Sequence, residues 1–138
     1  MNDSLREGGC LCGAVRYQLS GAPVDAGYCH CRTCQRASGA PIVAWVTYPI
    51  SAFALVRGAM RRYQSTAAAE RHFCPCCGSQ LTFRRLEVQG QIDITVATLD
   101  EPQHLPPAYH IWTRSQIPWL RVNDDLPRHP DNGPDKLL

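Results

Sequence analysis

The sequence lacks an excess of charge of either sign. Its 138 residues include 14 Lys and Arg and 12 Asp and Glu, which gives a formal net charge of +2. Acidic and basic residues are interspersed along the chain and do not gather into a basic stripe. Proteins that bind nucleic acid ordinarily need such a stripe to neutralise phosphates. We therefore expect no nucleic-acid partner.

The chain also lacks a leader-like start. Residues 1–9, MNDSLREGG, contain no basic segment followed by an apolar one, which is the pattern of secretory signals and transit peptides. We therefore expect a cytoplasmic protein, in a compartment that keeps ordinary thiols reduced. Eight cysteines in such a chain favour metal or redox chemistry over disulfides.

A long apolar helix is missing as well, although residues 37–56 carry no charge. A membrane-spanning helix needs about 20 such residues, but Pro41 and Pro49 interrupt this stretch and β-branched and aromatic residues dominate its first half. Proline breaks helices, and β-branched residues favour strands. The stretch predicts two strands, at 42–48 and 53–56, and no membrane span.

The length and the hydrophobic pattern predict one small, mainly β domain. Residues 11–19 alternate between apolar and polar or small side chains, as a strand does. Residues 33–38 predict one or two helical turns. Further short strands are predicted at 61–64, 71–73, 80–84 and 92–97. We expect the domain to span residues 1–128, with irregular proline-rich segments after residue 102 and a flexible tail at 129–138.

Two groups of cysteines have the spacing of metal-binding loops. In the first, Cys10 and Cys12 form a CxC motif, and Cys74 and Cys77 lie in FCPCCG. Short spacings of this kind turn both sulfurs toward one tetrahedral Zn²⁺, at about 2.3 Å. Pairing the two motifs predicts a closed four-sulfur site that joins the first strand to a distant hairpin and stabilises the fold.

The second group, Cys29, Cys31 and Cys34 in CHCRTC, offers three thiolates and leaves a fourth coordination position. Catalytic zinc sites keep such an open position. Because three thiolates overbalance the charge of Zn²⁺, we expect the site to bind and ionise a thiol rather than to activate water.

Three alternatives to an open zinc site stay open. Cys76 lies inside the FCPCCG motif, and if the two groups are neighbours it would close the second site and make it structural. Cys31 and Cys34 alone also have the CxxC spacing of redox dithiols, and the group would suit an iron–sulfur cluster. Disulfides are the third alternative.

Taken in order, these motifs resemble the glutathione-dependent formaldehyde-activating enzyme family, which includes centromere protein V. The resemblance runs through GGCLCGAVRY, CHCRTCQRASGAP, RHFCPCCGSQL, DITVATLDEP, HIWTRSQIPWL and DDLP. It implies a small zinc-bound β-tent of antiparallel sheets with one or two short helices. It also implies two zinc ions per chain, a structural one at Cys10, Cys12, Cys74 and Cys77 and a catalytic one at Cys29, Cys31 and Cys34. The family pattern gives Cys76 no role.

The same resemblance implies a carbon–sulfur lyase of the S-(hydroxymethyl)glutathione synthase type. In this hypothesis a thiol such as glutathione enters the open zinc position, loses its proton and adds to formaldehyde or another small aldehyde. The product is a hemithioacetal. The alternative is a noncatalytic two-zinc module for structure or interaction. A zinc-ribbon nucleic-acid binder fits less well, because the interval between the cysteine pairs is not the usual one.

Several side chains near the cysteines have an ordinary interpretation beside a functional one. Arg32 and Arg36 are four residues apart, so in a helix they would share a face and meet substrate carboxylates, or simply be solvated. For His30 and His110 we expect packing and satisfied hydrogen bonds, with His110 half-buried, whereas His72 is placed to orient a ligand. We expect core positions for the three tryptophans, Trp45, Trp112 and Trp119.

Overall fold

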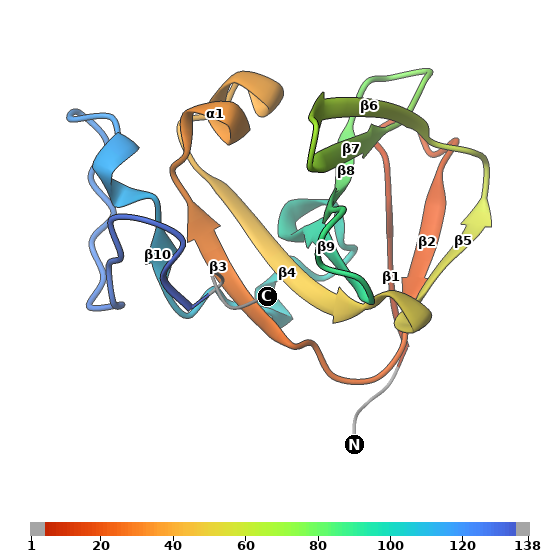
Figure 1. Ribbon diagram of the computed structural model, residues 1–138. Helices are drawn as coiled ribbons and strands as arrows, with labels where there is room; N and C mark the ends of the chain where they lie inside the picture. The colour runs from red at the N-terminus through yellow and green to blue at the C-terminus, as the bar shows by residue number, and fades with distance from the viewer. Residues whose placement is uncertain (1–4, 135–138) are drawn as a thin grey trace.

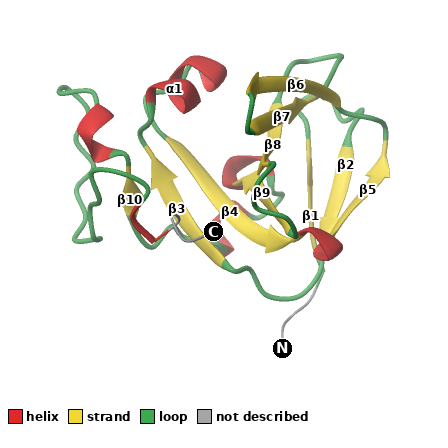
Figure 2. Cartoon of the chain, viewed as in Figure 1, coloured by secondary structure: helices red, strands yellow, loops and turns green. Residues whose placement is uncertain are grey.

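A computed structural model describes residues 5–134 and shows a mainly β protein (Figure 1). The described chain contains ten strands in two sheets and one α-helix, with four short 3₁₀ turns. Figure 2 shows strands and loops with few helical turns. The predicted fold class is therefore confirmed. No helix in residues 5–134 is long and apolar enough to cross a membrane.

The smaller sheet has three antiparallel strands in the order β1-β2-β5. These are β1 (Arg6–Gly9), β2 (Arg16–Leu19) and β5 (Phe53–Arg57). The strand predicted at 11–19 is thus wrong in its first part. The amide of Gly13 donates to the carbonyl of Cys10 at 3.2 Å, and Gly13 has φ 83°, a left-handed conformation that favours glycine. A turn therefore replaces the start of the predicted strand.

The larger sheet has seven strands in the order β10-β3-β4-β9-β8-β7-β6. Their bounds are β3 (Asp25–Cys29), β4 (Val43–Pro49), β6 (Arg61–Thr66), β7 (Ala69–Phe73), β8 (Gln80–Arg85), β9 (Gln91–Thr95) and β10 (His110–Ile111). All neighbouring pairs are antiparallel except β10 and β3, which are parallel. The expectation of purely antiparallel sheets is wrong for that one pair.

The sequence analysis missed three strands, β1, β10 and the longer β3. Gly21, Pro23 and Gly27 are turn-forming residues, so the pattern before Cys29 indicates a loop and not a strand. In the structure β3 is hydrogen-bonded on both sides, to β4 and to β10. Gly27 is required there for packing, since a Cβ on it would overlap the ring of Tyr109. The glycine therefore marks a close approach and not a turn.

The predicted helical turn at 33–38 is confirmed as α1 (Arg32–Ser38). The Sγ of Cys31 caps its start by accepting from the amide of Cys34 at 3.2 Å. Gly39, with φ 74°, ends the helix and donates its N–H to the carbonyl of Gln35. In Figure 1 α1 stands at the end of β3 and β4, across from the β6–β7 hairpin. The four 3₁₀ turns are Ile50–Ala52, Val96–Thr98, Pro102–His104 and Thr113–Ser115.

The main core draws on both sheets. Its fully buried members include Tyr17 and Leu19 from β2, Tyr48 from β4 and Ile94 from β9. A second, smaller core packs around β3, β4 and β10 and is formed by Cys29, Cys34, Val43, Trp45, Tyr109 and Ile111. The cysteines of the second group are therefore held in apolar surroundings.

The three tryptophans differ from the expected uniform burial. Trp45 is buried in the smaller core. Trp112 is only partly buried against that core and has φ 57°. Trp119 is 70% exposed, so its predicted core position is wrong. It follows Pro118 in an irregular segment that no strand covers.

The C-terminal segment lies beside β10 in Figure 1. The amide of Trp112 donates to the carbonyl of Asp131 at 2.9 Å, and the amide of Thr113 donates to that of His129 at 3.0 Å. The first part of the tail predicted at 129–138 therefore contacts the domain. Residues 135–138 of that tail, and residues 1–4 of the domain predicted at 1–128, lie outside the described residues.

Candidate metal centres and substrate site

The first cysteine group comes together as the sequence predicted. The sulfurs of Cys10, Cys12, Cys74 and Cys77 all lie within 4.8 Å of one another. Cys10 follows β1 of the small sheet, whereas Cys74 and Cys77 lie between β7 and β8 of the large sheet. A metal ion held by all four would therefore tie the two sheets together.

Backbone amides surround this group and suit negatively charged sulfurs. The amide of Val15 donates to Cys10 Sγ at 3.2 Å, and the amides of Cys76 and Cys77 donate to Cys74 Sγ at 3.3 and 3.4 Å. The hydroxyl of Ser79, 3.2 Å from Cys77 Sγ, is the main reason that the pKa of Cys77 falls to about 5. Hydrogen bonds of this kind favour the thiolate, which is the form that binds metal.

The second group also comes together, at the junction of β3 and α1. The sulfurs of Cys29, Cys31 and Cys34 lie within 4.8 Å of one another. Cys29 ends β3, Cys31 caps α1 and Cys34 lies in its first turn. Among residues 5–134 no fourth Cys, His, Asp or Glu joins the group. Cys76 is exposed and belongs to neither group, so the alternative in which it closes the second site gains no support.

The three thiols of this group differ in pKa. Hydrogen bonds from Cys29 and Cys34 lower the pKa of Cys31, while the same contact with Cys31 is the main cause that raises the pKa of Cys29. Three thiols at this separation, two of them buried, cannot all ionise without a compensating cation. A donor set made only of sulfur suits zinc or an iron–sulfur cluster. Each of the two groups can therefore hold a metal ion.

Two hollows adjoin the second group. One encloses about 340 Å³ and is lined by all three cysteines and by aromatic side chains, among them Trp45, Phe83, Tyr109 and Trp112. The other, of about 360 Å³, is lined by Cys31, Arg32 and Thr33 together with Ser65 and Thr66 at the end of β6. Both share Cys31, Arg71, Phe83 and Trp112 in their walls. The second group thus faces open space.

Comparison with known proteins decides the family. The model of the glutathione-dependent formaldehyde-activating enzyme family matches residues 5–115. The chain belongs to this family. The match covers both cysteine groups and all ten strands, and ends within the last 3₁₀ turn.

Individual relatives agree at low identity. A lyase of Schizosaccharomyces pombe, itself uncharacterised, is 31% identical over 84 residues, a match that spans 56% of this chain and 56% of the yeast protein. A Halomonas elongata protein named for the same family is 28% identical over 127 residues, or 86% of this chain and 81% of that protein. These names, like the family, support an enzyme.

A solved structure confirms the fold. A Rhodobacter sphaeroides protein of 24% sequence identity superposes with a TM-score of 0.59, covering 88% of this chain and 98% of its own. At that identity the likeness concerns the arrangement of strands alone. Any chemistry must come from the residues of this family member itself.

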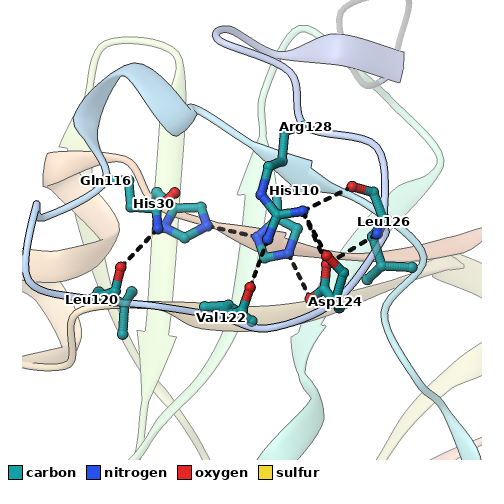
Figure 3. A network of polar contacts seen from close by, with 8 residues as sticks. All are labelled: His30, His110, Gln116, Leu120, Val122, Asp124, Leu126 and Arg128. Carbon is teal, nitrogen blue, oxygen red and sulfur yellow. Dashed lines mark hydrogen bonds and ion pairs between the residues drawn. The ribbon is translucent and has the colours of Figure 1, made fainter.

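A chain of two imidazoles and a carboxylate begins at His30, the residue between Cys29 and Cys31, and Figure 3 shows its members. His30 Nε2 is 2.8 Å from His110 Nδ1, and His110 Nε2 is 3.0 Å from Asp124 Oδ2. Since the carboxylate must accept from His110 Nε2–H, the Nδ1 of His110 accepts in turn from His30 Nε2–H. Burial is the main cause that lowers the pKa of His30 to about 4, so this imidazole is neutral at pH 7.

The expectation of packed, hydrogen-bonded histidines is met by this geometry, with one difference. His110 is fully buried rather than half-buried. Arg128 completes the arrangement by donating to Asp124 Oδ1 at 3.0 Å and to the carbonyl of Val122 at 2.8 Å. In the sequence these residues lie in two short stretches, HIW at 110–112 and NDD at 123–125. No regular spacing between the stretches indicated that His110 and Asp124 form a hydrogen bond.

The two arginines of α1, Arg32 and Arg36, border different hollows. Arg32 is exposed, donates to Gln35 Oε1 at 2.8 Å and lines the hollow beside Cys31. Arg36, also exposed, lines a different hollow of about 570 Å³ beside Tyr63 and Gly78. Arg32 is therefore the one of the pair that borders the second cysteine group.

His72 is engaged away from the metal-binding sulfurs. Its Nδ1 is 2.9 Å from the hydroxyl of Thr82 and its Nε2 is 3.0 Å from Glu70 Oε1. Both ring nitrogens thus have partners on β7 and β8, and the suggested role in orienting a ligand finds no contact to support it. The residue that the sequence analysis overlooked is its neighbour Arg71, which contacts Cys34.

Proposed function

We propose that this family member is a zinc-dependent carbon–sulfur lyase of the S-(hydroxymethyl)glutathione synthase type. It would bind a glutathione-type thiol at the second cysteine group and add it to formaldehyde or another small aldehyde. The observation that carries the proposal is the group of three sulfurs, Cys29, Cys31 and Cys34, at the wall of a cavity of about 340 Å³. Three ligands and adjoining space are what a catalytic zinc site requires.

The two cysteine groups then have separate tasks, with two zinc ions per chain. Cys10, Cys12, Cys74 and Cys77 would hold a structural zinc, because four sulfurs complete a tetrahedral shell and bridge the two sheets. Cys29, Cys31 and Cys34 would hold the catalytic zinc. Bound there, zinc supplies a Lewis acid that favours the thiolate form of an incoming thiol.

The remaining residues of the site provide shape and exclude water. Trp45 and Tyr109 belong to the smaller core, and with Phe83 and Trp112 they give the cavity an apolar wall. A thiolate that loses part of its hydration there is the stronger nucleophile toward the aldehyde carbon. The hemithioacetal forms when the sulfur adds to that carbon and the carbonyl oxygen takes up a proton.

Chain-level properties complete the proposal. We infer a single domain over residues 1–128 and a cytoplasmic location, with small-molecule partners only. The near-neutral charge supports the absence of a nucleic-acid partner.

Calorimetric titration of zinc-loaded protein with glutathione tests the proposal. We expect binding by the unaltered chain, loss of binding in Cys31→Ser, and unchanged binding in Cys76→Ser, whose exposed thiol belongs to neither group. Equal affinity in the unaltered chain and Cys31→Ser would contradict the proposal. Absence of binding in the fully loaded, unaltered chain would instead favour a noncatalytic two-zinc module.

A further inference from the structure

Arg71 is a buried cation in contact with the second cysteine group. It lies on β7 and is 6% exposed. Its Nη2 is 3.6 Å from Cys34 Sγ, and its guanidinium carbon lies 4.8 Å from the centroid of the Phe83 ring. Its Nη1 donates to Gln80 Oε1 at 3.2 Å. The side chain is therefore held in one orientation, against a sulfur of the cluster.

The charge of this guanidinium is not neutralised by a carboxylate. Within residues 5–134 Arg71 takes part in no ion pair with Asp or Glu. Its Nε is buried and has no hydrogen-bond partner in the same part of the chain. A buried cation and a buried donor both need a partner. The sulfur of Cys34 is the anion-forming group in direct contact with the guanidinium.

Arg71 also faces the space where a ligand of the cluster would enter. It lines both hollows that adjoin Cys31. An incoming ligand at the fourth position would therefore come within the field of the guanidinium. In a poorly hydrated site that field is screened far less than in water.

The charge count explains why a cation is needed there. Three thiolates and one Zn²⁺ together carry a net charge of about −1, and a substrate thiolate would bring it to about −2. Burying that second negative charge is unfavourable without a positive neighbour. A neutral ligand leaves the net charge of the site at about −1 and therefore does not need a positive neighbour.

We propose that Arg71 is a specificity-determining residue that makes the open position of the Cys29, Cys31 and Cys34 cluster prefer an anionic sulfur ligand. The inference rests on the proposed function, since it presupposes a metal with an open position at this cluster. It adds the residue that selects thiolates over neutral ligands. Arg71 acts by its charge and by its contact with Cys34, and it takes no proton from the substrate.

Binding to protein loaded with Co²⁺ tests this, because sulfur ligation of cobalt gives a charge-transfer absorption. Two small probes are titrated at fixed pH: 2-mercaptoethanol, which binds as a thiolate and carries no carboxylate, and imidazole, which binds as a neutral ligand. Arg71→Met keeps much of the side-chain length and removes the charge. Arg71→Lys keeps the charge without the planar fork. Arg61→Met, an exposed arginine on the neighbouring strand β6, controls for long-range charge.

We expect Arg71→Met to raise the Kd for 2-mercaptoethanol at least tenfold and to change the Kd for imidazole less than twofold. Arg71→Lys should recover most of the thiol affinity, and Arg61→Met should bind both probes like the unaltered chain. Equal thiol affinity in Arg71→Met and the unaltered chain would overturn the inference. An equal loss for both probes, shared by Arg71→Lys, would overturn it in favour of a structural role. If the unaltered, cobalt-loaded chain bound no thiol at all, the proposed function itself would fail.

Discussion

His30 Nε2 lies 2.8 Å from His110 Nδ1, and both imidazoles are fully buried. This contact joins the single residue between Cys29 and Cys31 to His110 of β10. Through Asp124 it also reaches the C-terminal segment (Figure 3). The backbone agrees with it, since the amide of His30 donates to the carbonyl of Ile111 at 3.1 Å. The position of Cys29 and Cys31 therefore depends on residues about 80 positions later in the chain.

Replacing His110 should destabilise the fold. In His110→Ala the Nε2–H of His30 loses its acceptor in a buried site, and a cavity forms beside it. An unsatisfied buried donor costs about 1–3 kcal/mol, and the cavity adds to it. We expect urea unfolding to show a loss of about 2 kcal/mol or more. His104→Ala, at a side chain 54% exposed, is the control and should change stability by less than about 0.5 kcal/mol. Equal effects in the two variants would contradict this account of the network.

The ion pair between Arg16 and Asp100 predicts a pH dependence of stability. Two hydrogen bonds, of 3.0 and 2.6 Å, join the guanidinium to the carboxylate, and they lower the pKa of Asp100 below its usual value. The folded chain therefore binds fewer protons than the unfolded chain in the acidic range, so this contribution is present above the unfolded pKa and is lost as the pH falls through the lowered pKa of the folded chain.

Asp100→Asn should remove that contribution. Because both side chains are partly exposed, we expect a difference of no more than about 1 kcal/mol at pH 7. The stability curves of the variant and the unaltered chain should converge as the pH falls. A double-mutant cycle with Arg16→Met isolates the pair. A gap between the curves that stayed constant from pH 7 to pH 3 would exclude the pair as its source.

Gly27→Ala should disturb the wall of the cavity. A Cβ at this position would lie 2.6 Å from Cζ of Tyr109, whose hydroxyl donates to Asp25 at 3.0 Å. Overpacking of this kind costs about 1–3 kcal/mol. Tyr109→Phe, which removes the hydroxyl and keeps the ring, should cost about 1 kcal/mol. Thermal unfolding of both variants compares the two effects, and a Gly27→Ala chain as stable as the parent would mean that Tyr109 has room to move.

The cysteines were predictable from the sequence because metal-binding loops have short, fixed spacings. Cys10 and Cys12 meet Cys74 and Cys77 across about 60 residues, yet each pair already had the spacing of a metal-binding loop. The predicted strands at 42–48 and 53–56 also agree with β4 and β5, since continuous apolar or alternating runs are strong local signals.

Residues whose environment is set by distant segments were not predictable. Gly27 has the signature of a turn but lies in a strand, because Tyr109 packs over it. Arg71 looks like an ordinary strand arginine, and its contact with Cys34 of α1 arises only in the folded chain, from a residue 37 positions away. Trp119 has the composition of a core residue but lies on an irregular, exposed segment. In each case tertiary packing, and not local propensity, decided the outcome.

The two cysteine groups should differ in their effect on stability. Cys74 is fully buried, and its group connects the two sheets, so Cys74→Ser should lower the unfolding midpoint in urea sharply or prevent folding. Cys34→Ser alters a group that lies within one sheet and its helix, and should be tolerated better. Circular dichroism followed through urea unfolding makes the comparison. A more severe effect of Cys34→Ser would assign the structural role to the second group.

Zinc per chain, measured by elemental analysis of protein purified without chelator or added thiol, tests the central claim most directly. The account predicts about two zinc atoms in the unaltered chain and in Cys76→Ser, and about one in a folded Cys29→Ser variant. The Cys29→Ser chain should keep its β-sheet circular dichroism, because the four-sulfur group is intact. A count near one in the unaltered chain, unchanged by Cys29→Ser, would contradict the account by showing that Cys29, Cys31 and Cys34 hold no stable zinc.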